Sequence, residues 1–175
     1  MLIQLSDILS KEQGIQHTDA SFTMEMFSCR LGDFPVIDKT DIAFTITNKG
    51  NKVLLIEGKG NVTLQIPCSR CLTEVAVPIP LDFDREVDMK LTEQERIEAL
   101  DESNYICGGN LDVDQLVYNE ILIGLPIRVL CKDDCKGICS HCGTNLNEGS
   151  CQCENENLDP RMAVIRDIFS KFKEV

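Results

Sequence analysis

The chain contains ten cysteines, and most of them are spaced so that they could share metal ions. Six lie close together near the C-terminus, in the pattern Cys131-x3-Cys135-x3-Cys139-x2-Cys142-x8-Cys151-x-Cys153. A further pair, Cys68-x2-Cys71, lies much earlier in the chain. Two residues between sulfurs allow both thiolates to reach one tetrahedral ion. In a reducing compartment, such clustered cysteines indicate metal binding rather than disulfides.

Ligand counting divides these eight cysteines into two zinc sites. The segment 139–143, Cys-Ser-His-Cys-Gly, is typical of a zinc knuckle, in which the glycine permits a positive φ under the metal. We predict that the first site consists of Cys139, Cys142, Cys151 and Cys153. The second site would tie the C-terminal segment to the sheet and consists of Cys68, Cys71, Cys131 and Cys135. Four thiolates close the coordination shell, so both sites would be structural, and zinc is favoured over iron.

Three other residues near this pattern receive simpler interpretations. His141 lies between two predicted ligands and is expected to point to solvent. Cys29 and Cys107 remain outside both sites and are expected to be small buried hydrophobic residues.

A redox pair is the alternative interpretation of Cys68 and Cys71. Thioredoxin-type motifs open a helix after a strand, whereas this pair has β-like sequence on both sides, so metal binding is favoured. The sequence offers few residues for other kinds of catalysis. The chain has two histidines, no glycine-rich phosphate loop and no HExxH motif. We therefore expect a protein that is not an enzyme.

The net charge of -12 favours a basic protein as partner, through complementary charge. Segment 82–102 alone holds nine acidic and three basic residues. The simpler alternative is that this charge keeps the protein in solution. RNA binding would need local basic patches, because phosphate contacts come from lysine and arginine. The candidate patches are Arg128, Lys132 and Lys136, or Arg161, Arg166, Lys171 and Lys173.

The elements expected to position these residues are mostly strands in the first 90 residues. Alternating and β-branched segments predict strands over 41–47, 53–56, 62–66, 75–77 and 83–89. The sequence Asn48-Lys49-Gly50-Asn51 predicts a turn, and Gly58 with Gly60 predicts a bulge or a second turn. Several short strands with close turns indicate an antiparallel sheet, or a partial barrel, in an α+β fold.

Helices are expected in the later parts of the chain. Thr92 and Glu95 form a capping-box pattern, and apolar spacing predicts a helix over 113–121 that ends before Pro126. Residues 128–153 have too little apolar content to fold by burial alone, which favours a metal staple. Asp159-Pro160 begins a predicted C-terminal helix, and its apolar stripe consists of Met162, Ile165, Ile168, Phe169 and Phe172.

These elements divide the chain into two predicted parts. Residues 1–126 would form a mainly β domain with an acidic helical segment at its end. Residues 127–175 would form the cysteine-rich zinc module, with the C-terminal helix packed on it. The chain shows no internal repeat. Its first residues do not resemble a signal peptide and no run of 18 apolar residues occurs, so we expect a cytoplasmic protein without a membrane span.

The motifs together resemble those of a known family. The segment Pro67-Cys68-Ser69-Arg70-Cys71-Leu72 resembles a central CxRC signature, and residues 125–147 resemble a C-terminal signature that begins with Leu-Pro. Cys151-Gln152-Cys153 and Asp159-Pro160-Arg161 continue the resemblance. On these residues the chain is similar to the YceD-type family, the large ribosomal RNA subunit accumulation proteins.

This resemblance implies a role in the synthesis, processing or stability of 23S ribosomal RNA. Family members are often encoded beside a small zinc-ribbon ribosomal protein, and the family has no established catalytic residues. We expect a non-catalytic factor that binds a ribosomal protein or a pre-ribosomal particle of the large subunit through its acidic face. The alternatives are a zinc protein that contacts ribosomal RNA directly and a CxxC thiol redox protein.

Overall fold

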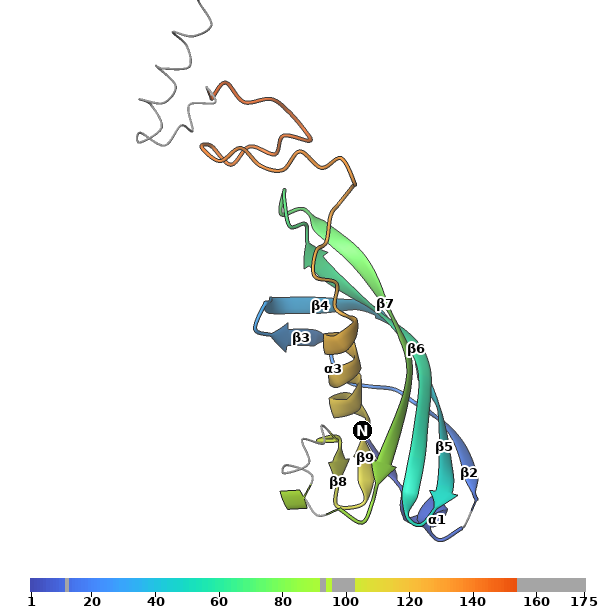
Figure 1. Ribbon diagram of the computed structural model, residues 1–175. Helices are drawn as coiled ribbons and strands as arrows, with labels where there is room; N and C mark the ends of the chain where they lie inside the picture. Colours follow the sequence, from blue (N-terminus) through green and yellow to red (C-terminus); the bar gives the residue numbers. More distant parts are fainter. Residues whose placement is uncertain (12, 92–93, 96–102, 154–175) are drawn as a thin grey trace, which may run out of the picture.

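The computed structural model describes residues 1–11, 13–91, 94–95 and 103–153 (Figure 1). The predicted C-terminal helix, its basic patch, and most of the acidic segment after residue 91 lie outside this part of the chain. The described part contains two helices and two antiparallel sheets, which confirms the α+β class and the predicted antiparallel sheet.

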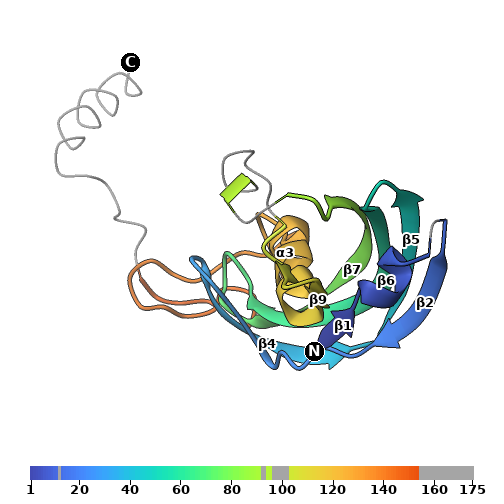
Figure 2. The same ribbon diagram turned by 90° about the horizontal axis from the view of Figure 1, so that it is seen from below.

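The main sheet has six strands, in the order β2-β5-β6-β4-β3, and β7 pairs with β6. Their bounds are β2 Ile15–Ala20, β3 Met26–Cys29, β4 Gly32–Lys39, β5 Ile42–Gly50, β6 Val53–Pro67 and β7 Glu74–Asp88. The turn predicted after residue 48 is present, since Asn51 and Lys52 adopt left-handed φ values of 54° and 62° between β5 and β6. Figure 2 shows that the sheet curves strongly around one helix.

The bulge or turn predicted at Gly58 and Gly60 is wrong. β6 continues through both glycines for 15 residues and pairs with β7 from Val53 to Pro67 without interruption. The reason for Gly58 is packing, because a Cβ at this position would lie 2.2 Å from Cζ of Phe83 on β7. The predicted strands 53–56 and 62–66 are therefore parts of one long strand, and 75–77 and 83–89 fall along the other.

A smaller sheet and two helices complete the described fold. The sheet has the order β1-β9-β8, with β1 Leu2–Gln4, β8 Ile106–Cys107 and β9 Asn110–Asp112. Helix α1 covers Ser6–Leu9, and α3 covers Val113–Gly124. The carboxylate of Asp112 caps α3 by accepting from the amides of Asp114 and Gln115, and α3 ends shortly before Pro126 as predicted. None of the helices in the described ranges is long and apolar enough to cross a membrane.

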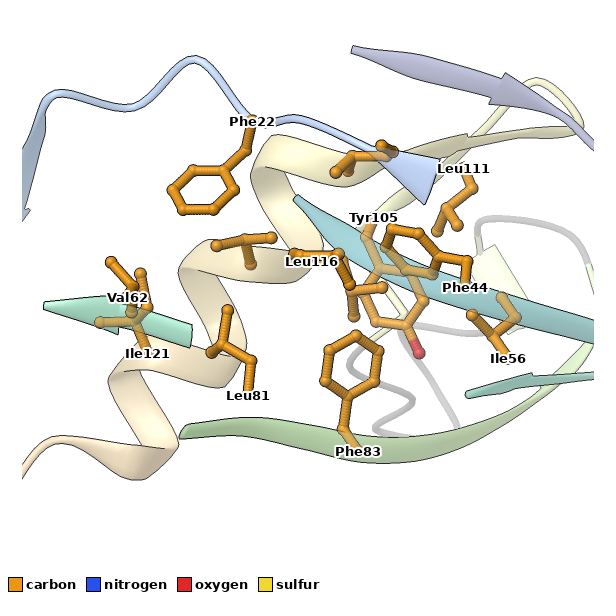
Figure 3. Packing of buried hydrophobic residues seen from close by; sticks show 14 of the residues in the cluster. Phe22, Phe44, Ile56, Val62, Leu81, Phe83, Tyr105, Leu111, Leu116 and Ile121 are labelled. Carbon is orange, nitrogen blue, oxygen red and sulfur yellow. The ribbon is translucent and has the colours of Figure 1, made fainter. Parts of the chain in front are cut away.

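The core lies between α3 and the concave face of the sheet. Leu116 of α3 packs close to Phe44 of β5 and Phe83 of β7, and Ile121 of α3 lies beside Val62 of β6 (Figure 3). The rings of Phe44 and Phe83 meet edge to face, with their centroids 6.1 Å apart. This packing fixes the long β6–β7 hairpin, whose far end carries the first cysteine pair.

Candidate metal centres

The hairpin between β6 and β7 presents Cys68 and Cys71 at its tip, far from the small sheet (Figure 1). After α3 the chain runs along the hairpin to the same tip. There the Ser69 amide donates to the Val129 carbonyl at 2.8 Å, and the Val129 amide donates to Oγ of Ser69 at 3.2 Å. This pairing brings Cys131 and Cys135 to the hairpin tip. We call Cys68, Cys71, Cys131 and Cys135 the hairpin cluster.

The geometry of the hairpin cluster fits a tetrahedral metal ion. All four sulfurs lie within 4.8 Å of one another. The Sγ atoms of Cys68 and Cys135 are 3.8 Å apart, and those of Cys71 and Cys131 are 3.4 Å apart. A tetrahedral zinc ion with sulfur ligands needs sulfur–sulfur distances of roughly 3.8 Å. Three of the four thiols are buried and Cys131 is exposed, so the residues present form a nearly closed shell of soft ligands.

Arg70 and Asn147 hold the hairpin cluster together without being ligands. Nη1 of Arg70 donates to the Cys135 carbonyl at 2.7 Å, and the Arg70 carbonyl accepts from the Ile138 amide at 3.2 Å. Nδ2 of Asn147 donates to Sγ of Cys135 at 3.3 Å. Hydrogen bonds to thiolate ligands orient them and tune the metal, so these side chains extend the candidate site.

The remaining four cysteines meet in the C-terminal segment. Cys139, Cys142, Cys151 and Cys153, here called the loop cluster, also have all sulfurs within 4.8 Å of one another. Their thiols are half-buried or exposed, and a pocket of about 460 Å³ opens beside them. His141 is exposed between two of them, as expected. The structure thus brings together the same two sets of four cysteines that ligand counting selected.

The two CxxC turns have the same local structure. In each turn the first cysteine accepts through its carbonyl from the residue after the second cysteine, Leu72 at 3.0 Å and Gly143 at 2.9 Å. Both of these residues have left-handed φ values, 62° for Leu72 and 73° for Gly143. In each turn the first cysteine amide also donates to a threonine carbonyl, Thr73 at 2.8 Å or Thr144 at 2.9 Å. Such turns aim amides at the sulfurs, as in zinc knuckles.

This similarity exposes a repeat that sequence reasoning missed. The hexapeptides 68–73 and 139–144 share the pattern Cys-Ser-x-Cys-x-Thr. The threonine hydroxyls lie 3.3 Å from Sγ of Cys71 and 3.1 Å from Sγ of Cys142. Aligning the two CxxC segments would have identified Thr73 and Thr144 as part of the candidate sites. Asn147 had no comparable signal in the sequence.

Backbone and hydroxyl donors shift the thiol pKa values in a way that suits metal binding. Burial acts to raise the pKa of Cys68, but amide donors from Cys71, Arg70 and Cys131 outweigh it and lower the pKa to about 6. Hydrogen bonds from the hydroxyl and amide of Thr144 lower the pKa of Cys142 to about 6 as well. The pKa values of Cys71 and Cys139 are lowered as well, so each cluster holds two thiols that lose their protons more readily than an ordinary cysteine.

The opposite shift, a raised pKa, affects Cys131 in the hairpin cluster and both Cys151 and Cys153 in the loop cluster. Hydrogen bonding to Cys71 and burial raise the pKa of Cys131 to about 12. Hydrogen bonding to Cys142, burial and repulsion raise the pKa of Cys153 to about 12. Cys131 and Cys153 keep their protons beside the existing thiolates until a cation compensates the charge.

The two cysteines outside the clusters do not contribute to either candidate site. Cys29 is half-buried on β3, and Cys107 on β8 is exposed, so the expectation that Cys107 is buried is wrong. It lies in a two-residue strand followed by Gly108 and Gly109, both with positive φ, at the edge of the small sheet. That position gives its side chain little to pack against.

Comparison with known proteins gives distant relatives. An uncharacterized protein of Mycobacterium leprae is 24% identical over 119 residues, which cover 67% of this chain and 54% of that protein. An uncharacterized protein of Mycobacterium tuberculosis is 25% identical over 96 residues, which cover 55% of this chain and 46% of that protein. The chain thus spans about half the length of these curated relatives. No significant match to a solved structure is found.

A third relative carries a descriptive name. The large ribosomal RNA subunit accumulation protein YCED homolog 1 of Arabidopsis thaliana, a chloroplastic protein, is 33% identical over 49 residues, covering 28% of this chain and 15% of that protein. The family described as large ribosomal RNA subunit accumulation protein YceD matches residues 56–169, which include both cysteine clusters. Because this match covers more than half of the sequence and confirms the resemblance of its motifs, the chain belongs to the YceD family.

Proposed function

We propose that this chain is a non-catalytic factor of large ribosomal subunit biogenesis that acts in the cytoplasm. It would promote the synthesis, processing or stability of 23S ribosomal RNA by binding a basic ribosomal protein or an rRNA–protein intermediate. Membership of the YceD family supports a role in the accumulation of large-subunit ribosomal RNA. The net charge of -12 supports a basic partner, since complementary charge speeds encounter and selects partners.

The two four-cysteine clusters are the observation that carries the structural part of this proposal. Zinc, bound by the hairpin cluster and the loop cluster, would act as a structural ion because four thiolates leave no open coordination position. The chain's own residues then order the C-terminal segment against the hairpin. Arg70 and Asn147 position Cys135, while the two CxxC turns present their amides to the sulfurs.

Co-purification tests the partner. Tagged protein isolated from cells at low salt, without chelator, should carry large-subunit ribosomal proteins that mass spectrometry identifies, and elution should occur as salt rises. Native mass spectrometry of the same sample should report the number of zinc ions. A preparation that holds zinc but carries no ribosomal component at low salt would contradict the proposed partner and leave the metal assignment intact.

Direct contact with ribosomal RNA is the second candidate function. The side chains of Arg128, Lys132 and Lys136 are exposed near the clusters, and none of them forms an ion pair with another described residue. A gel-shift series with 23S ribosomal RNA fragments would decide, since phosphate contacts weaken steeply as salt rises. The redox alternative for Cys68 and Cys71 has less support, because their turn leads into a strand and their sulfurs lie beside those of Cys131 and Cys135.

A further inference from the structure

Strand β7 leaves one edge of the main sheet open. It pairs with β6 along its whole length, and within the described ranges no strand pairs with its other edge. Pro78 and Pro80 establish which residues face that edge. Proline has no N–H to donate to β6, so Pro78 and Pro80 occupy positions whose backbone groups face away from β6. Because such positions alternate along an antiparallel strand, the other even-numbered residues of β7 also direct their backbone groups outward. The amides and carbonyls of Asp82, Asp84 and Glu86 therefore point to the open edge, where the Asp84 carbonyl accepts from Nη1 of the exposed end of Arg85 at 3.1 Å.

The two halves of this edge differ. The half near the cysteine clusters contains Pro78 and Pro80, which remove two outward donors and prevent a further strand from pairing there. The other half, residues 82–87, has no proline and spans roughly 20 Å. Natural sheets usually protect exposed edges, and here the protection by proline stops at residue 80.

Charge on the open half favours a cationic strand. The side chains of Asp82, Asp84 and Glu86 are exposed on the outer face of the sheet. Nζ of Lys59 lies 3.9 Å from Oδ1 of Asp82, and Nζ of Lys49 lies 2.6 Å from Oε2 of Glu86. These two carboxylates therefore already form ion pairs within the chain.

Asp84 has an acidic residue as its cross-strand neighbour. Glu57 of β6 lies directly opposite Asp84 in the register. Like charges in this arrangement destabilise a strand pair unless a cation lies between them. Within the described part of the chain, neither carboxylate forms an ion pair. A lysine or arginine from a partner would relieve this repulsion.

A pocket on the inner side of the edge offers a small apolar surface among mostly polar groups. It has a volume of about 350 Å³ and is lined by Arg85 and Glu86 of β7, by Ser103 and Tyr105, and by Asn119, Glu120 and Ile123 of α3. The side chains of Arg85 and Glu86 leave the strand on opposite faces, so the pocket must lie at its open edge. Ile123 is 67% exposed and forms an apolar surface there.

We propose that residues 82–87 bind an extended, basic segment of a partner protein as an additional β-strand. Cationic side chains of that segment would lie over Glu57 and Asp84, and alternate apolar side chains would contact Ile123. The inference rests on the proposed function and specifies how the basic partner is held. A second copy of this chain would place one acidic row against another, and RNA would meet like charge, so both fit the edge less well.

The test uses the full-length, metal-loaded protein and a short synthetic peptide in which lysine and valine alternate. Amide hydrogen exchange should slow at Asp82, Asp84 and Glu86 when the peptide is added, and calorimetry should show saturable binding. The control peptide is methylated on the alternate backbone nitrogens that would pair with β7. It retains the charge and loses the strand pairing, so it should bind about tenfold more weakly or less.

Two proline variants of the protein form a matched pair. Asp84→Pro removes an outward donor together with a carboxylate in the open half, so Asp84→Asn, which removes the charge and keeps the donor, is measured beside it. Ala76→Pro removes an outward donor in the half already blocked by Pro78. Both positions have the parity that β7 already tolerates for proline, so pairing with β6 should persist. We expect Asp84→Pro to weaken peptide binding about tenfold and Ala76→Pro to leave it unchanged.

Several results would overturn the proposal. One is failure of the wild-type protein to bind the peptide at low salt. Another is binding of the methylated peptide as tight as that of the unmethylated one, a comparison that uses only the wild-type protein and does not depend on the folding of any variant. Concentration-dependent dimers that disappear in Asp84→Pro would assign the edge to a second copy instead. If the peptide result is negative while ribosomal proteins still co-purify, the edge assignment fails alone. If peptide binding holds and no ribosomal component co-purifies, only the proposed function fails.

Discussion

At the scale of single residues, the candidate ligands are distinguished from other cysteines by what surrounds them. Cys135 is 2% exposed, and its Sγ lies 3.8 Å from Sγ of Cys68. The same Sγ accepts a hydrogen bond from Nδ2 of Asn147 at 3.3 Å. Cys107 is exposed and belongs to neither cluster. Exposure alone does not separate the two kinds, because Cys131 is exposed as well; what the cluster cysteines share is three other sulfurs within 4.8 Å.

Replacing one ligand should remove one ion. Cys135→Ser leaves three sulfurs in the hairpin cluster, so we expect the zinc content to fall by about one ion per chain and thermal stability to fall with it. Elemental analysis and native mass spectrometry check the ion count. Cys107→Ser is the matched control and should keep the full content. Equal zinc in both variants would exclude Cys135 as a ligand.

Zinc binding should release protons, and its affinity should decrease as the pH falls. The pKa values of Cys131 and Cys153, raised to about 12 by their thiol neighbours, keep both protonated near neutral pH until the ion arrives. Cys68 and Cys142, with pKa values lowered to about 6, add to the proton release only when the pH falls below that value.

Calorimetry in two buffers that differ in ionisation enthalpy measures this proton release. The number of protons released should therefore increase below about pH 6. Binding enthalpies at neutral pH that are the same in both buffers would show that no proton leaves, which is incompatible with protonated ligands. The metal contribution to stability is then greatest at neutral and higher pH and is lost on acidification.

At the scale of elements, the sequence predicted those features that depend on local pattern. The α+β class, the turn after residue 48 and the end of α3 before Pro126 all follow from periodicity, turn residues and caps. The grouping of the eight cysteines came from counting ligands. The continuity of β6 through Gly58 could not be predicted, because it depends on Phe83, which is distant in sequence and adjacent only once β6 and β7 pair.

Gly58→Ala should destabilise the sheet. The new methyl group would lie 2.2 Å from Cζ of Phe83, so the ring must move within a packed core, at a cost of about 1–3 kcal/mol of unfolding free energy. Urea denaturation measures this cost. Gly149→Ala, where a Cβ meets nothing within 4 Å, is the control. The cost should shrink in a Phe83→Leu background, and an unchanged cost there would place the strain elsewhere.

At the scale of the whole molecule, two parts of the described chain are stabilised by different interactions. The sheet and α3 share an extensive apolar core. In contrast, Cys135 is the one buried side chain between residues 131 and 153, a segment that the structure describes throughout. The order of that segment must therefore come from hydrogen bonds and from the cysteine clusters. The predicted domain boundary after residue 126 stays a prediction.

Removing metal should therefore disorder the C-terminal segment and spare the sheet. After chelation we expect amides such as those of Cys139, Gly143 and Leu146 to exchange hydrogen roughly tenfold faster or more, while amides of β5 and β6 keep their protection. Hydrogen exchange with mass spectrometry resolves the two regions. Unchanged exchange across 131–153 would mean that metal does not order this segment.

The hairpin cluster also imposes an order of events during synthesis. Two of its sulfurs belong to the β6–β7 hairpin, whereas Cys131 and Cys135 follow 60 and 67 positions after their partners Cys71 and Cys68. A growing chain emerges from its amino end, so the hairpin can pair and pack while its tip still carries half a ligand set. A chain that stops before residue 131 would retain the sheet strands and α3 but would lack Cys131 and Cys135, so the hairpin cluster could not be completed.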